Sequence, residues 1–237
     1  MLNRGRSAGE RKEAARELLA LACESRSQIM LNRGVPSWLA SDGRRSTLEA
    51  FFLATLIFGH DDELSQLVIL DLLSLSAEVR RWRTPLHVAD LLAEDYSIAA
   101  LRRLNRVEEA RRRAGALLQQ VNSLLGNRVE FELLLETTRQ MPSPDVASDW
   151  HMGPDSLSFI IAHLAMAFQG TIPPELPDRF VELVKDQRVE WFNIARVYER
   201  AGMKSKAFDY YRRVAQESHP SPEERRLSLE ALERLKE

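Results

Sequence analysis

Apolar residues recur at spacings of three and four along most of the chain, which is the period of an amphipathic α-helix. Two series show this spacing clearly: Leu64, Leu67, Val68, Asp71, Leu72 and Leu75, and Val107, Ala110, Ala114, Leu117, Leu118 and Val121. No segment alternates apolar and polar residues as a half-buried strand does. The pattern therefore predicts an all-α fold, with helices near residues 8–30, 47–58, 61–75, 85–94, 97–104, 107–124, 127–141, 155–168, 178–186, 188–201, 204–217 and 222–236.

Polar residues and prolines mark where several of these helices begin. Ser7–Glu10 and Ser46–Glu49 have the spacing of a capping box, in which the hydroxyl accepts from a backbone N–H and the glutamate reaches back. Thr84–Pro85 and Ser221–Pro222 place proline at the first helical position, where its missing N–H costs nothing. These signals favour many helices of medium length.

Two stretches interrupt the helical pattern. Pro142–Asp155 is the longer and contains Trp150, and Gly170–Pro177 is a shorter break. Trp150 either belongs to a binding loop or folds back onto the core. Because helices usually end before such clusters of proline and glycine, we expect an N-terminal α-helical domain at residues 1–141, a linker or loop at 142–154 and a C-terminal domain at 155–237.

Composition and charge restrict the class of protein. The 237 residues are 44% hydrophobic and 29% charged, with a net charge of -2, whereas disordered chains combine low hydrophobicity with high net charge. The neutrality holds only in sum, because residues 76–128 carry a net charge of +4 and residues 129–186 a net charge of -7. Opposed blocks of this kind favour faces that are solvated or that dock within the same chain.

Neither a membrane span nor a disulfide framework is expected. Ser156–Pro174 is the longest uncharged stretch, but its apolar part is much shorter than the ~20 residues that a spanning helix needs. We expect a buried core helix there, with His163 as a core histidine, in a cytoplasmic protein. The single cysteine, Cys23, excludes intrachain disulfides and multi-cysteine zinc sites.

No catalytic, metal-binding or cofactor-binding motif stands out. The histidines lack the spacing of a zinc site, and the glycines form neither a P-loop nor a dinucleotide-binding fingerprint. We therefore expect a protein that is not an enzyme and holds no cofactor. An unrecognised hydrolase built around His60 or His151 is a further hypothesis, which requires a second catalytic group beside one of them in a pocket.

Arginines gather in the region 79–113. Glu108 and Glu109 lie at helical spacing from Arg112 and Arg113, which favours a self-paired, solvated face. Nucleic-acid binding is disfavoured, because phosphate contacts need an unpaired basic stripe. The alternative hypothesis is a regulatory helical protein that contacts nucleic acid or an acidic partner through a basic patch of Arg80, Arg81, Arg83, Arg102, Arg103 and Arg106.

The C-terminal part carries eight landmarks at regular positions: Trp191, Ile194, Ala195, Tyr198, Gly202, Ala207, Tyr211 and Val214. Small residues such as Ala195 and Ala207 let two helices approach, and Gly202 can adopt the positive φ that ends the first helix. Over residues 188–221 this pattern resembles the tetratricopeptide repeat. Leu101, Asn105, Ala110 and Ala114 repeat part of it 97 residues earlier, since asparagine can replace glycine at such a helix end.

The resemblance implies a right-handed α-solenoid of antiparallel helix pairs, tetratricopeptide-like in its C-terminal part, with Pro222–Lys236 as a terminal capping helix. It also implies a protein-protein interaction module, an adaptor or scaffold, that holds a partner peptide or protein in a groove. The sequence is compatible with a homo-oligomer. Carried over by position, the groove residues would be Val189, Phe192, Asn193, Arg196 and Arg200.

Overall fold

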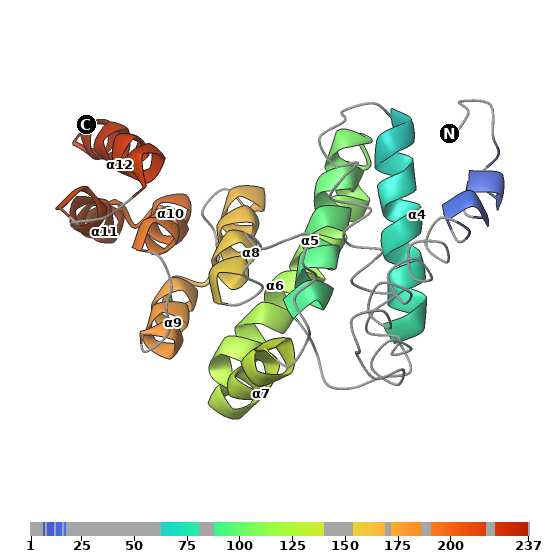
Figure 1. The fold of residues 1–237 in the computed structure, drawn as a ribbon, viewed down its shortest axis with the longest axis horizontal. Helices are drawn as coiled ribbons and strands as arrows, with labels where there is room; N and C mark the ends of the chain where they lie inside the picture. Colours follow the sequence, from blue (N-terminus) through green and yellow to red (C-terminus); the bar gives the residue numbers. More distant parts are fainter. Residues whose placement is uncertain are drawn as a thin grey trace, which may run out of the picture. The chain divides into compact units, whose positions relative to one another are not determined.

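The computed structural model describes residues 7, 9–11, 13–15, 17, 63–80, 88–139, 154–168, 172–185, 191–216 and 221–236. Within these ranges every regular element is a helix (Figure 1), so the all-α prediction is confirmed. Residues 9–11, 13–15 and 17 are helical. The helices that follow are α4 (Glu63–Arg80), α5 (Val88–Arg103), α6 (Val107–Gly126), α7 (Arg128–Arg139), α8 (Pro154–Ala167), α9 (Glu175–Val184), α10 (Trp191–Arg200), α11 (Lys204–Gln216) and α12 (Pro222–Leu235).

Three predicted helix boundaries were wrong. Helix α4 continues to Arg80, five residues beyond the predicted end at residue 75. Residues 88–103 form one helix, α5, where a break after residue 94 was predicted. The polar Ser97 does not interrupt it, because its hydroxyl is buried and donates to the Ala93 carbonyl at 2.9 Å. Helix α9 begins at Glu175, three residues before the predicted start. Pro177 lies in its first turn, where a missing N–H breaks no helical hydrogen bond.

Two of the predicted helix starts have the expected caps. The Ser7 N–H donates to Glu10 at 2.7 Å and the Glu10 N–H donates to the Ser7 hydroxyl at 3.3 Å. Ser221 and Glu224 form the same capping box at the start of α12, with Pro222 in the first turn. The starts predicted at residues 46–49 and 84–85 lie outside the described residues.

The chain divides into two compact units, Met1–Arg113 and Ala114–Glu237, and the division falls within α6. The linker predicted at residues 142–154 lies outside the described residues except for Pro154, which begins α8. The domain boundaries predicted at this linker therefore stay a prediction.

The first unit is built on the contact between α4 and α5 (Figure 1). Helix α4 buries Val68, Ile69, Leu72 and Leu73. Helix α5 is buried on all sides, with Val88, Leu91, Leu92, Ala93, Ile98, Ala100 and Leu101 as its buried apolar residues. Helix α5 ends at a left-handed residue, Asn105, with φ 58°. The Arg106 N–H donates back to the Leu101 carbonyl at 2.8 Å, which closes the helix end.

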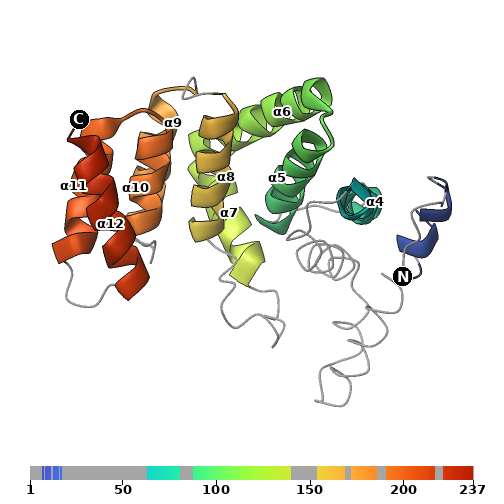
Figure 2. The same cartoon turned by 90° about the horizontal axis from the view of Figure 1, so that it is seen from above.

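In the second unit, α10 packs against α8 on one side and α11 on the other, and α11 packs against α12 (Figure 2). Its core includes Ile160, Ile161, Phe180, Ala195 and Ala207, each of them fully buried. A turn at Ala201–Met203 joins α10 to α11, and Gly202 in this turn has φ 75°. Because the turn is short and the two helices pack together, they form an antiparallel hairpin.

Helix α8 only partly confirms the expected core helix. Leu157, Leu164 and Ala165 are buried, but His163 is exposed, so its prediction as a core histidine was wrong. The error arises because α8 is apolar on most of its surface and the sequence does not show which side neighbouring helices cover. Among the described residues, no helix combines the length and the apolar character needed to cross a bilayer.

Candidate partner-binding site on α8 and α10

The predicted groove residues lie at different depths in the structure. Arg196 and Phe192 are half-buried and Arg200 is exposed, at spacings of four that place them on one side of α10. Asn193 is only 8% exposed and has an interaction partner, so it offers a partner protein little surface. Val189 lies outside the described residues.

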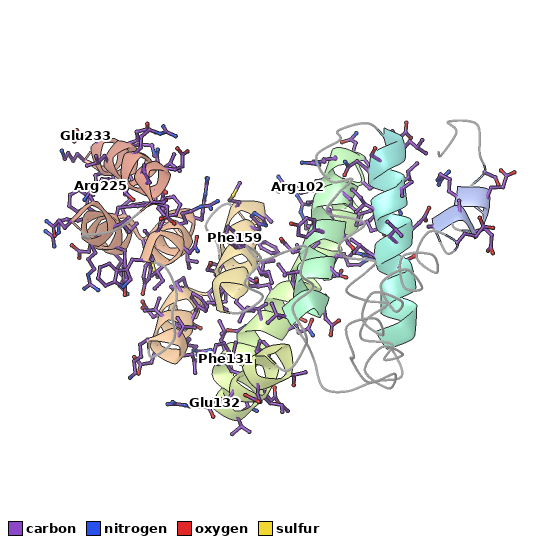
Figure 3. The ribbon with its side chains drawn as sticks, in the orientation of Figure 1. Arg102, Phe131, Glu132, Phe159, Arg225 and Glu233 are labelled. Carbon is purple, nitrogen blue, oxygen red and sulfur yellow. The ribbon has the colours of Figure 1, made fainter. Side chains whose placement is uncertain are left out.

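Arg196 joins α10 to α8 at the surface. Its guanidinium carbon lies 5.4 Å from the ring centre of Phe159 on α8 and 5.9 Å from that of Phe192 on α10. Both distances suit a cation–π interaction, which stabilises an arginine side chain over an aromatic face. Figure 3 labels Phe159 on α8. The two helices thus hold Arg196 at their junction.

Helix α8 contributes a stripe that the sequence analysis did not include in the site. Phe159 and Met166 are 38% and 45% exposed, and His163 lies exposed between them. Spacings of four and three place all three on one side of the helix. We name the surface made by Phe159, His163, Met166, Phe192, Arg196 and Arg200 the α8–α10 face. The signal in the sequence was the helical spacing of Phe159, His163 and Met166, but it was interpreted as part of a core.

A carboxylate on α10 binds it to the two helices that follow. Glu199 accepts a hydrogen bond from the Tyr211 hydroxyl of α11 at 2.6 Å and another from Arg234 of α12. Burial on its own raises the pKa of Glu199, but the hydrogen bonds from Tyr211 and Arg234 outweigh it and hold the pKa below its ordinary value. Burial and the nearby Glu199 carboxylate raise the pKa of Tyr211. Glu199 is therefore ionised, and each of its two carboxylate oxygens accepts a hydrogen bond.

A second network connects α10 with α9 and α11. Asp178 accepts from the Tyr198 hydroxyl at 2.9 Å and from the Lys206 ammonium at 2.6 and 2.7 Å. The hydrogen bond from Lys206 is the largest cause that lowers the pKa of Asp178. Burial, followed by the bond to Asp178, raises the pKa of Tyr198. The two networks together fix α10 against three other helices.

Aromatic side chains make further contacts between α10 and α11. Trp191 is 40% exposed, and the Arg213 guanidinium lies 5.9 Å from the Trp191 ring centre and 4.9 Å from that of Tyr210. Tyr198 stacks on Tyr210, with ring centres 5.6 Å apart. These contacts add to the packing of α11 on α10.

The arginines of the alternative basic patch are partly paired. Arg106 pairs with Glu109, and Arg103 has an interaction partner. Arg102, which is labelled in Figure 3, is exposed, as are Arg103 and Arg106. Arg80 belongs to α4, and Arg81 and Arg83 lie outside the described residues.

Glutamates at the start of α6 pair with other arginines of this region. Arg111 pairs with Glu108 at 3.1 Å, and Arg113 lies 3.6 Å from Glu94 and 4.0 Å from Glu109. The expected pairing of Glu109 with Arg113 is confirmed, whereas Glu108 pairs with Arg111 and not with Arg112. The arginines at the start of α6 therefore belong to a largely self-paired surface.

His60 and His151, the residues of the hydrolase hypothesis, lie outside the described residues. Within the described ranges, no three side chains of histidine, cysteine, aspartate or glutamate gather so as to hold a metal ion. No family model, no characterised protein and no solved structure matches the chain. The geometry of α8 and α10 is therefore the main structural guide to function.

Proposed function

We propose that the chain is a non-enzymatic interaction module, an adaptor or scaffold, whose α8–α10 face binds a peptide segment of a partner protein. The observation that carries this proposal is the exposure of Phe159, which lies against Arg196, and of Met166 on the same side of α8, on two helices that pack together. Apolar side chains next to an arginine are the composition typical of the energetic centre of a protein interface. Exposed apolar patches on a folded domain often mark such interaction sites.

We further propose that α10 and α11 form a tetratricopeptide-like repeat with α12 as the capping helix. The positive φ of Gly202 supports this, as does the complete burial of Ala195 and Ala207, the small residues that let the two helices approach. Tyr198 and Tyr211 are buried at the two aromatic positions of the pattern.

The preceding pair, α8 and α9, would be a degenerate repeat of the same kind. Ala162 of α8 and Phe180 of α9 are buried. They would take the places of Ala195 and Tyr211, with two more residues between them than in the α10–α11 pair. Successive helix pairs of this kind would build a right-handed solenoid. The first helix of each pair would line its concave side, and the direct packing of α8 on α10 supports this arrangement.

Comparative co-purification from cell extract tests the proposal. The full-length chain is used as wild type, as the double variant Phe159→Ser/Met166→Ser and as the control Leu229→Ser, which removes an exposed apolar side chain from α12. Since all three positions are substantially exposed, we expect the variants to fold, which circular dichroism checks. We expect one or more proteins to be retained by the wild type and the control and lost from the double variant.

A retained protein is then purified and titrated against the three chains. A dissociation constant that rises only for Phe159→Ser/Met166→Ser supports the proposed face. Equal binding by the wild type and this variant, or equal loss with Leu229→Ser, would contradict it.

A further inference from the structure

The chemistry of the α8–α10 face also specifies what kind of segment it binds. The Arg196 guanidinium carbon lies over the rings of Phe159 and Phe192, and a guanidinium carries its N–H donors in a rigid planar fork. Within the described ranges, no carboxylate lies within ion-pair distance of Arg196. Arg196 therefore presents a planar fork of donors beside two aromatic rings.

Most described arginines of the neighbouring helices form ion pairs with carboxylates, whereas Arg196 does not. Arg212 pairs with Asp209 at 3.1 Å, Arg226 with Glu223 at 2.7 Å, and Arg234 with Glu199. These pairs are mostly exposed, where an ion pair contributes little stability, but they neutralise charge locally. Arg196 carries a positive charge that its described neighbours do not offset.

The rest of the face adds positive charge and apolar surface. Arg200 is exposed and interacts electrostatically with the Glu199 carboxylate, whose pKa it helps to lower. The one carboxylate on the adjoining side of α10, Glu199, is already engaged by Tyr211 and Arg234. Phe159 and Met166 supply the exposed apolar surface. A complementary ligand is therefore negatively charged and also apolar.

We infer that the α8–α10 face binds an acidic peptide segment, in which an aspartate or glutamate binds Arg196 and an adjacent apolar side chain packs on Phe159 and Met166. This inference rests on the proposed function. Arginine prefers bidentate hydrogen bonds to carboxylates, and these bonds are among the stronger ones in proteins. The apolar neighbours favour a peptide over a nucleic-acid backbone, which offers phosphates without apolar side chains.

Selection of random dodecapeptides displayed on phage, with the full-length chain as bait, tests the inference. We expect the selected peptides to be enriched in aspartate or glutamate next to an aromatic or aliphatic residue. A selected peptide is synthesised in its acidic form and with each acid replaced by the matching amide. Both forms are titrated by fluorescence anisotropy against wild type, Arg196→Gln and the control Arg212→Gln, whose arginine is paired within α11.

For wild type and Arg212→Gln, the acidic peptide should bind at least about tenfold more tightly than the amide peptide, which is the scale of one charge-assisted hydrogen bond. For Arg196→Gln this ratio should fall close to one. A purely structural role of Arg196 would weaken both peptides equally and leave the ratio unchanged, which would overturn the inference.

The selection also separates failure of the inference from failure of the proposed function. Peptides without acidic enrichment that lose binding to Phe159→Ser/Met166→Ser would overturn the acidic ligand and leave the interaction face in place. Peptides that bind this double variant as well as wild type, or the absence of any enriched peptide, would overturn both.

Discussion

The ends of α5 and α10, 97 residues apart, have the same backbone and different surroundings. Asn105 and Gly202 both have positive φ, 58° and 75°. After each, an N–H donates to a carbonyl five residues earlier, from Arg106 to Leu101 at 2.8 Å and from Met203 to Tyr198 at 2.9 Å. This is the pattern of a Schellman motif, which ends a helix with a left-handed residue. Asparagine and glycine, the residues that most readily adopt positive φ, thus end the two helices in the same way.

The side chains around the two turns differ. Near the second turn, Tyr198 and Tyr211 donate to carboxylates on neighbouring helices, and each carboxylate also binds a cation. Near the first turn, the corresponding buried positions hold Leu101 and Ala114, and the ion pairs at the start of α6, such as that of Arg111, are exposed. The comparison teaches that the turn fixes the direction of the chain, whereas buried tyrosines fix how firmly adjacent helices are connected.

Tyr211→Ala introduces the residue found at the corresponding position 114. This substitution should lower the free energy of unfolding more than the others described below. The variant loses a buried aromatic ring and the hydrogen bond to Glu199, and large-to-alanine changes in a core cost about 3–5 kcal/mol. Hydrogen exchange measured by mass spectrometry should show faster exchange in α10, α11 and α12. The turn at Asn105 serves as the internal control, and equal acceleration there, or none in α11, would contradict the prediction.

Substitutions at Gly202 and Asn105, the two residues with positive φ, should change the free energy of unfolding less than Tyr211→Ala does. Gly202→Ala should destabilise the protein by about 1–2 kcal/mol, the cost of a left-handed conformation for a residue with a Cβ atom. The cost is conformational alone, because a Cβ atom at Gly202 would meet nothing within 4 Å. Gly202→Asn should cost clearly less, and Asn105→Gly should change stability little. Urea denaturation measures these differences, and an equal loss for alanine and asparagine at position 202 would refute the common role of the two turns.

These turns show which parts of the fold local sequence can predict. The capping boxes at Ser7 and Ser221 and the helix end at Asn105 depend on residues within one turn of each other. Their geometry follows from hydrogen bonds that short segments make by themselves. The wrong break in α5 shows the limit, because Ser97 is compatible with a loop or a helix and its burial decides between them.

The candidate site was only partly predictable for a related reason. The resemblance to the tetratricopeptide repeat implied that Phe192, Arg196 and Arg200 line a groove, and in the structure they lie at the surface to different degrees. Whether the apolar side chains of α8 are covered depends on which helices pack there, and no local pattern gives this. Phe159 was therefore missed, and Asn193 was expected in the groove although its side chain is buried.

The smallest expected effect concerns pH. It compares Glu199, which accepts hydrogen bonds from two other helices, with Glu109, whose ion pair with Arg106 is local. Because its hydrogen bonds keep the pKa of Glu199 low in the folded protein, the unfolded chain binds its proton at a higher pH, close to the ordinary value of about 4.3. The stability that Glu199 contributes is therefore complete above that value and is lost as the pH falls through the lower, folded pKa.

Tyr211→Phe removes one donor to Glu199, so it should cost about 1 kcal/mol near neutral pH, and this difference from wild type should shrink as the solution is acidified. Glu109→Gln alters partly exposed pairs with Arg106 and Arg113, and such pairs contribute about 0.2–1 kcal/mol or less. Melting temperatures between neutral and acidic pH give both curves. A difference between Tyr211→Phe and wild type that stayed constant through this range would mean that the Tyr211 hydroxyl does not help to keep Glu199 charged.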